Sequence, residues 1–374
     1  MPGQRKEAMT ETSESERAGS AMGQAGEARA SQSDGPESAR TAVPPGRAQS
    51  IDSAVKRILE FESNSVLVAL IVLAVAIGIA HSDFLAWSNI KNVLQQSVYV
   101  GILAAGMAFL ISMREIDLSV GSMFGLTVII SALLMHHMNP WIAAVVGILA
   151  GGAMGLLNAI LVQGIAIPAI VATLATLNMF RGLAIALSNG QQVQGLPQQS
   201  AFFTRLGGNT AGLPTSVWIL IITAIVLTLV LRFTPFGYRV RSIGSNPEAA
   251  TFSGISIPRV RVQALVLMGV LCGVAGILGL AFFESGDPNI GTGFELQAIA
   301  AAIIGGTPLR GGSATVFGAV FGAILLSVVS SGLVFFNVPL NWSQFATGAV
   351  ILIAVSLDSL VRRRRRGQSA GLAL

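Results

Sequence analysis

A small set of ionisable residues stands inside, or at the edges of, long apolar segments of this sequence. They are Arg114, Glu115, Asp117, Arg181 and Glu295. Charged groups are costly at membrane depth, so those that occur there face a cavity, a partner charge or an interface. These residues are therefore candidates for a functional or ion-paired role. The simpler alternative, that the first three mark the end of a loop, stays open.

Other patterns that suggest chemistry fall short of a catalytic or metal site. Residues 306–313 resemble a phosphate-binding loop, but Gly312 stands in place of its lysine and no strand precedes it. We expect a glycine-rich turn there and no bound ATP. His136 and His137 are adjacent without a third ligand, and Cys272 is the only cysteine. No Ser-His, paired carboxylate or His-Glu-x-x-His arrangement lies within the apolar segments. The sequence thus predicts no catalytic residue, no metal and no cofactor bound by this chain.

Composition predicts a membrane protein. Of the 374 residues, 52% are hydrophobic and 11% are charged, against about 25% charged in an average soluble domain. Residues 118–180, 262–283 and 311–357 contain no Asp, Glu, Lys or Arg. A membrane helix needs roughly 20 apolar residues, and these continuous runs do not alternate as the strands of a β-barrel do. We predict an all-α, polytopic bundle of about ten membrane helices.

Hydropathy and turn residues give approximate bounds for these helices. The predicted spans are residues 65–82, 97–113, 118–138, 141–162, 165–187, 214–233, 260–283, 294–306, 314–336 and 343–361. The eighth is short enough to be a half-span, and the fifth is expected to be broken or tilted. Gly147, Gly151 and Gly155, and Gly269 and Gly273, have the four-residue spacing that lets membrane helices pack closely.

The ends of the chain differ from the permease domain predicted at residues 65–361. Residues 1–50 are rich in Gly, Ser, Ala, Glu and Arg, which predicts a disordered cytoplasmic tail. Residues 51–64 are expected to form an amphipathic lead-in at the membrane surface, and residues 362–374 a basic cytoplasmic tail.

Basic residues predict the orientation and argue against nucleic acid. With ten spans, 20 Lys and Arg residues fall on the side of the two termini and only Lys91 and Arg205 on the other. Excess basic residues mark the cytoplasmic side, so both termini are expected there. The net charge of +5 comes from residues that flank spans, as contact with anionic lipid requires. We expect membrane lipid, and no nucleic acid, as a partner.

The loop after the sixth span predicts a short cytoplasmic helix. Asn246 suits an N-cap, Pro247 the first helical position and Glu248 the positive end of the helix dipole. Gly254 is placed to end the helix. Arginines surround this segment, which favours a docking element for a cytosolic partner.

Four ordered motifs resemble the ribose-type ABC monosaccharide permeases of bacteria, a family whose members transport ribose, xylose, arabinose or galactosides. They lie at residues 106–122, 167–183, 244–255 and 293–312, and the resemblance covers about residues 65–361. It implies an inner-membrane permease subunit without ATPase activity, working by alternating access. It also implies three protein partners: a cytosolic ABC ATPase that hydrolyses the ATP, a periplasmic sugar-binding protein, and a second permease copy or paralogue in a homodimer or heterodimer.

The resemblance also implies roles for individual residues. The coupling helix that the ATPase grips would comprise Gly244, Asn246, Glu248, Ala249, Ala250 and Gly254. The translocation pathway would be lined by Glu115, Asp117, Asn178, Phe180, Arg181 and Glu295. Three departures from the family pattern leave the sugar or polyol unassigned. Gln297 replaces a common Asp, Ala159 a common Gly, and Arg114-Glu115 residues that are often small.

A different class of transporter remains as the alternative. An ion-coupled secondary transporter of a small solute would use Glu115, Asp117 and Glu295 as relay groups. It would take up solute alone, in a manner abolished by an uncoupler, whereas an ABC permease needs its ATPase and ATP.

Overall fold

A computed structural model describes residues 63–339 and, beyond them, the single positions 342, 345, 348, 349, 352 and 356. The predicted segments 1–50 and 362–374 lie outside the described residues. So do nearly all of the lead-in at residues 51–64 and most of the tenth predicted span.

Helices occur at every predicted span that lies within residues 63–339, so the chain is a polytopic helical membrane protein. They are α2 (Ser63–Ala80), α3 (Trp87–Ser112), α4 (Val120–Met135), α5 (Pro140–Ala159), α6 (Ala169–Leu187), α8 (Thr215–Phe233), α11 (Ile257–Phe283), α12 (Phe294–Ile304) and α13 (Val316–Phe335). By length and composition, six of the described helices can cross a membrane: α3, α5 with its extension, α6, α8, α11 and α13.

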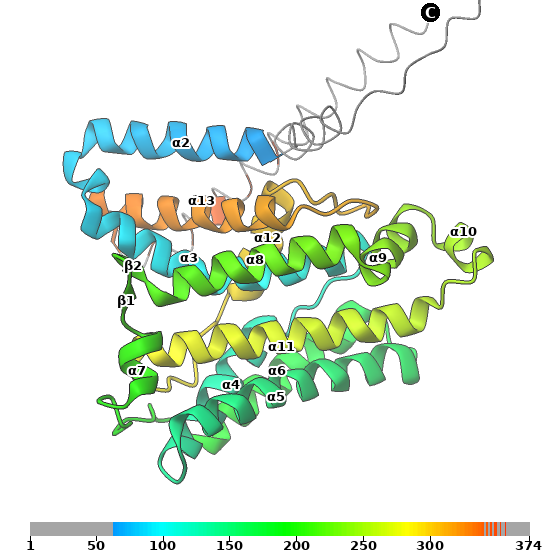
Figure 1. Ribbon diagram of the computed structural model, residues 1–374, viewed down its shortest axis with the longest axis horizontal. Helices are drawn as coiled ribbons and strands as arrows, with labels where there is room; N and C mark the ends of the chain where they lie inside the picture. Colours follow the sequence, from blue (N-terminus) through cyan, green and yellow to red (C-terminus); the bar gives the residue numbers. More distant parts are fainter. Residues whose placement is uncertain are drawn as a thin grey trace, which may run out of the picture. The chain divides into compact units, whose positions relative to one another are not determined.

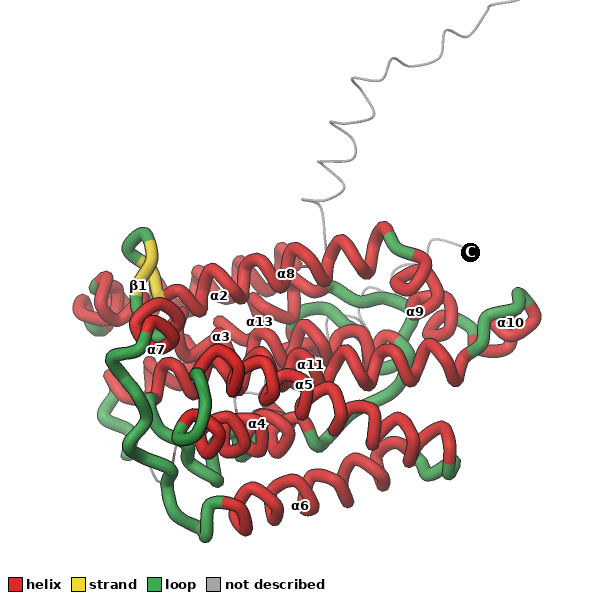
Figure 2. Tube along the Cα trace, turned by 60° about the horizontal axis from the view of Figure 1, so that its bottom comes forward, coloured by secondary structure: helices red, strands yellow, loops and turns green. Residues whose placement is uncertain are grey.

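Short elements join these helices. They are the 3-10 helix η1 (Ser82–Leu85), the π-helix η2 (Ile160–Gly164) that extends α5, the helices α7 (Ala201–Leu206), α9 (Pro235–Ser245) and α10 (Pro247–Phe252), and the strands β1 (Asn209–Thr210) and β2 (Leu213–Pro214). The two strands pair antiparallel. Figures 1 and 2 show α9 and α10 at one end of the long helices, and α7 with β1 at the other.

Helix α3 forms the centre of the bundle. All residues from 97 to 113 are buried, and α3 packs against α8, α11, α12 and α13. The helix begins ten residues before the predicted span, and some of the polar side chains in this stretch find partners inside the protein. Gln95, for example, donates to the Tyr99 hydroxyl at 2.6 Å and accepts a hydrogen bond from Ser216. A hydropathy scale scores glutamine as polar and therefore excludes such a residue from a predicted span.

Glycines bring α5 and α11 into backbone contact, as their spacing predicts. A Cβ on Gly151 would lie 2.5 Å from the carbonyl oxygen of Gly269, and a Cβ on Gly273 would lie 2.8 Å from the Cα of Ile148. Larger side chains at these positions would push the two helices apart.

Of these nine helices, α2, α4 and α12 are not among the six, and α4 and α12 are clearly shorter than a membrane span. At 1.5 Å per residue, α12 with 11 residues is about 16 Å long and α4 with 16 residues about 24 Å, against a hydrocarbon core of about 30 Å. Irregular segments at residues 113–119 and 284–293 precede them. Such backbone is tolerated at membrane depth only when protein or a watery cavity surrounds it.

The expected break near α6 lies before the helix rather than inside it. Residues 165–168 form the interruption, Pro168 is the N-cap, and α6 continues through Asn178 and Arg181. The predicted start at residue 165 is therefore four residues early, because Pro168 disfavours a helical conformation in the residue before it.

Candidate functional site

The short helix predicted after residue 246 is present as α10, with the capping that the sequence indicates. The Asn246 side chain accepts a hydrogen bond from the Ala249 backbone N–H at 3.1 Å, and Pro247 occupies the first turn. Gly254 follows the helix with a φ of 78°, a conformation that favours glycine. Helix α9, which precedes it, was missed. The signal was Thr234-Pro235, where the Thr234 hydroxyl accepts a hydrogen bond from the Gly237 N–H.

The six residues expected on the ATPase-facing surface divide by burial. Asn246, Glu248, Ala249 and Gly254 are exposed, whereas Gly244 and Ala250 are buried within the chain. Sequence reasoning missed Phe252, whose side chain is 91% exposed at the end of α10. An aromatic ring so exposed on a six-residue helix is a typical anchor for a binding partner.

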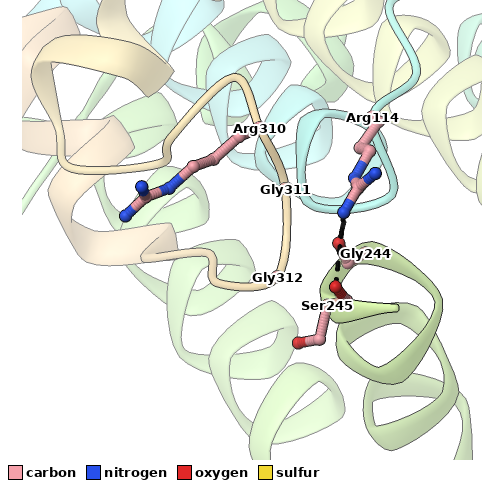
Figure 3. A pocket seen from close by; sticks show the side chains of 6 residues that line it. All are labelled: Arg114, Gly244, Ser245, Arg310, Gly311 and Gly312. Carbon is pink, nitrogen blue, oxygen red and sulfur yellow. Dashed lines mark hydrogen bonds between the residues drawn. The ribbon is translucent and has the colours of Figure 1, made fainter. Parts of the chain in front are cut away.

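Three backbone segments meet beside α10 around a pocket of about 460 Å³ (Figure 3). They come from the end of α3, the end of α9, and the turn between α12 and α13. The lining residues are Arg114, Gly244, Ser245, Arg310, Gly311 and Gly312. The turn is the glycine-rich one predicted in place of a nucleotide site, and Gly306, Gly311 and Gly312 all have positive φ.

Asp117 lies at the centre of a buried polar cluster between residues 113–119 and α5. Its carboxylate accepts hydrogen bonds from the Ser119 N–H at 2.8 Å, the Ser119 hydroxyl at 2.7 Å and the Asn158 amide at 3.2 Å. All three residues are fully buried. Burial raises the pKa of the Asp117 carboxyl above its ordinary value, and the hydrogen bonds oppose this effect only in part.

Glu115 has a charged partner on a distant helix. Its carboxylate lies 2.8 Å from the Arg261 guanidinium at the start of α11. Burial raises the pKa of Glu115, and the positive charge of Arg261 acts in the opposite direction. The ion pair fastens the irregular segment 113–119 to α11.

Arg181 and Glu295 lie in a second cluster, where α4, α6 and α12 approach one another. One Arg181 nitrogen donates to the carbonyl oxygens of Pro288 and Ile290, both at 2.8 Å. A Cβ on Gly121 would collide with the Glu295 carboxylate and the Gly291 carbonyl. Glu295 thus lies at the N-terminal ends of both α4 and α12, where helix dipoles stabilise negative charge.

Asn178 and Phe180 lie on either side of α6. Phe180 is buried, whereas Asn178 is exposed and its amide donates to the Leu174 carbonyl of its own helix at 3.1 Å. The structure therefore groups the predicted pathway residues in two places. Glu115 and Asp117 anchor residues 113–119, and Arg181 with Glu295 surrounds residues 287–295.

No group of three or more His, Cys, Asp or Glu side chains that would hold a metal lies among residues 63–339.

Comparisons with known proteins place the chain in a family. Residues 89–355 match the protein family described as "Branched-chain amino acid transport system / permease component". The L-arabinose ABC transporter permease of Azospirillum brasilense is 32% identical over 304 residues, 81% of this chain and 89% of that protein. The ribose import permease of Escherichia coli K12 is 33% identical over 296 residues, 78% and 92% of the two chains. The autoinducer 2 import permease of Salmonella typhi is 32% identical over 300 residues, covering 79% and 85%. No solved structure matches the chain.

Proposed function

This chain belongs to the permease family of ABC importers, and from that membership we propose how it works and what it carries. It is a multi-pass protein of the inner membrane and a transport subunit rather than an enzyme. We propose that it carries a monosaccharide or a similar small polyol inward by alternating access. The observation that carries this proposal is the similarity, over about four-fifths of the chain, to permeases named for arabinose and ribose import.

The energy for transport would come from a cytosolic ATPase that docks on α10. This chain would bind no cofactor, and the partner would hydrolyse the ATP. The support is local: α10 is capped at both ends, and it presents Glu248, Ala249 and Phe252 to solvent. A rigid, exposed helix with an aromatic anchor suits a socket on another protein.

The other partners follow from the same membership. A periplasmic sugar-binding protein would deliver the solute at the end that carries α7, β1 and β2. A second permease copy or a paralogue would cover α6, where Asn178 is exposed among apolar side chains such as Leu174 and Met179. A polar side chain on an apolar membrane face calls for a protein or water neighbour. The pathway would then run between two permeases, beside Arg181 and Glu295. In the proposed topology, the chain would have about ten membrane spans and both of its termini would lie in the cytoplasm.

The function is tested by reconstitution in liposomes. The chain alone should transport no ribose or L-arabinose, whereas the chain with its ATPase, its binding protein and ATP should accumulate its sugar. The rival, an ion-coupled transporter, would show uptake by the chain alone that an uncoupler abolishes. Relatives named as ABC permeases favour the ATP-driven function.

The docking surface is tested by the double substitution Glu248→Arg with Phe252→Ala. Both side chains are exposed, so folding should be unaffected, and co-purification with the ATPase should fall at least tenfold, as expected for loss of one anchor. The matched control is Arg205→Glu with Leu85→Ala, an exposed charge and an exposed apolar side chain at the opposite end. Equal loss in the control, or none in the test variant, would refute α10 as the docking element.

A further inference from the structure

At the junction beside α10, three backbone segments are in direct contact with one another. A Cβ on Gly244 would collide with the carbonyl oxygen of Ser112 and would lie 2.5 Å from the Gly312 nitrogen. The Gly312 N–H in turn donates to the Ser112 carbonyl at 2.9 Å. Backbones in direct contact leave no side chain between them to absorb a displacement.

Each segment of the junction leads directly into an element of the candidate site. Ser112 and the residues after it continue through 113–119 to the N-terminal end of α4. Gly244 and Ser245 continue into Asn246, the N-cap of α10. Gly311 and Gly312 belong to the turn after α12. This N-terminal end of α4 meets the N-terminal end of α12, the end away from the turn, where Gly121 contacts Gly291 and Glu295.

Arg114 is the side chain that ties this junction together. Its Nε donates to the Gly244 carbonyl at 3.1 Å and its Nη2 to the Ser245 carbonyl at 3.3 Å (Figure 3). The neighbouring carboxylate, Glu115, is paired with Arg261 instead. Both acceptors of Arg114 lie in the last residues before α10, so the guanidinium links the docking element to residues 113–119.

Arg114 holds this position in a strained conformation. Its φ is 65°, in the left-handed region where a glycine sits without cost. A strained residue persists where the surrounding structure requires its side chain. The requirement here is the pair of hydrogen bonds to the end of α9.

We propose that Arg114 is a positioning residue that couples α10 to the two short helices α4 and α12. It acts through the Gly244–Ser245 backbone. This inference rests on the proposed function, because it takes α10 as the element that the ATPase moves. Motion of α10 would pull residues 113–119 and the turn after α12 together, and would so displace the cluster around Arg181 and Glu295.

The test uses Arg114→Gly in the full chain assembled with its ATPase in liposomes. Glycine removes both hydrogen bonds and also relieves the positive φ, so the melting temperature should stay near that of the unsubstituted protein. Radiolabelled ribose or L-arabinose transported per ATP hydrolysed should fall about tenfold or more, the effect of losing a charge-assisted hydrogen bond. Arg114→Lys, which lacks the forked donor, should give an intermediate ratio.

The matched control is Arg310→Ala, which removes the same charge from the same pocket. Figure 3 shows the Arg310 side chain leaving the turn on the side away from Arg114. The Arg310→Ala variant should therefore transport sugar at the normal ratio to ATP hydrolysed. A second measurement needs no sugar. Asn289→Cys, exposed in residues 284–293, is labelled by maleimide in a Cys272→Ala background. ATP should change its labelling rate in the unsubstituted and Arg310→Ala proteins, but not in Arg114→Gly.

Several results would overturn the inference. A normal ratio of sugar transported to ATP hydrolysed, together with a normal labelling response in Arg114→Gly, would show that Arg114 does not couple α10 to α4 and α12. Loss of ATPase co-purification in that variant would make Arg114 part of the docking surface instead. An equal defect in Arg310→Ala would mean that the positive charge of the pocket, rather than the hydrogen bonds of Arg114, is what transport requires. Failure of the unsubstituted chain to bind any ATPase would refute the proposed function, and the inference with it.

Discussion

Asp117 shows how much a single buried side chain depends on its immediate neighbours. It accepts three hydrogen bonds from two residues, yet no cationic side chain is among those partners. The helix dipole of α4 begins three residues later and favours a negative charge. Desolvation acts against that charge and is the larger effect, so the pKa of the Asp117 carboxyl is raised above its ordinary value.

Asp117→Asn should therefore change how stability depends on pH. Because the pKa is raised in the folded protein, its stabilising contribution is complete below the ordinary aspartate pKa of about 3.9 and is lost as pH rises through the folded value. The melting temperature of the detergent-purified protein should therefore fall as pH rises across that window. The asparagine variant should lack this component.

Asp83→Asn, at an exposed carboxyl in η1, serves as the control and should follow the unsubstituted protein. A melting temperature that instead rises with pH, and does so only while Asp117 is present, would mean that the hydrogen bonds and the helix dipole outweigh burial.

At the scale of elements, the glycine contacts between α5 and α11 make a sharp prediction. Gly269→Ala should lower the free energy of unfolding by about 1–3 kcal/mol, because its Cβ would lie 2.8 Å from the Gly155 nitrogen and would overpack the crossing. Gly182→Ala, on α6, has nothing within 4 Å of the added Cβ and should be neutral or slightly stabilising. Thermal unfolding of both variants in one detergent provides the measurement, and equal effects would contradict the assigned crossing.

Elements with a continuous local signal were predictable from sequence. Apolar runs located the membrane helices between residues 63 and 339, and Asn246-Pro247 with Gly254 located α10 and its ends. The ten extra residues of α3 were not predictable from hydropathy. Gln95, for example, is buried because Tyr99 and Ser216 satisfy its hydrogen-bonding groups, and these partners are visible only in the structure. Helix α9 was overlooked because its glycines obscured the Thr234 cap.

The candidate site was less accessible to sequence reasoning than the fold. Charged residues at apolar boundaries identified Glu115, Asp117, Arg181 and Glu295, but not which of them meet. The pairing of Glu115 with Arg261 joins residues 146 positions apart in the chain. The burial of Ala250 and the exposure of Phe252 depend on how α10 rests on α9 and α11, which no local pattern specifies.

At the scale of the whole molecule, the predicted orientation assigns each end of the bundle to one side of the membrane. In a Cys272→Ala background, Ser253→Cys beside α10 should react with a membrane-impermeant maleimide only after the cells are opened. Gln192→Cys, exposed at the opposite end, should react in intact spheroplasts. The expectation rests on the excess of basic residues on the α10 side. The reverse pattern of labelling would invert the topology.

The brevity of α12 bears on how the chain is made in the cell. During synthesis its 11 residues leave the ribosome after α11 and before α13. A segment of about 16 Å is too short to partition into lipid as an independent stop. It therefore depends on contacts with other helices of the bundle, and α12 packs against both α3 and α13. Membrane insertion would thus deliver the Glu295 end of α12 to its position against α4 through contacts with protein rather than with lipid.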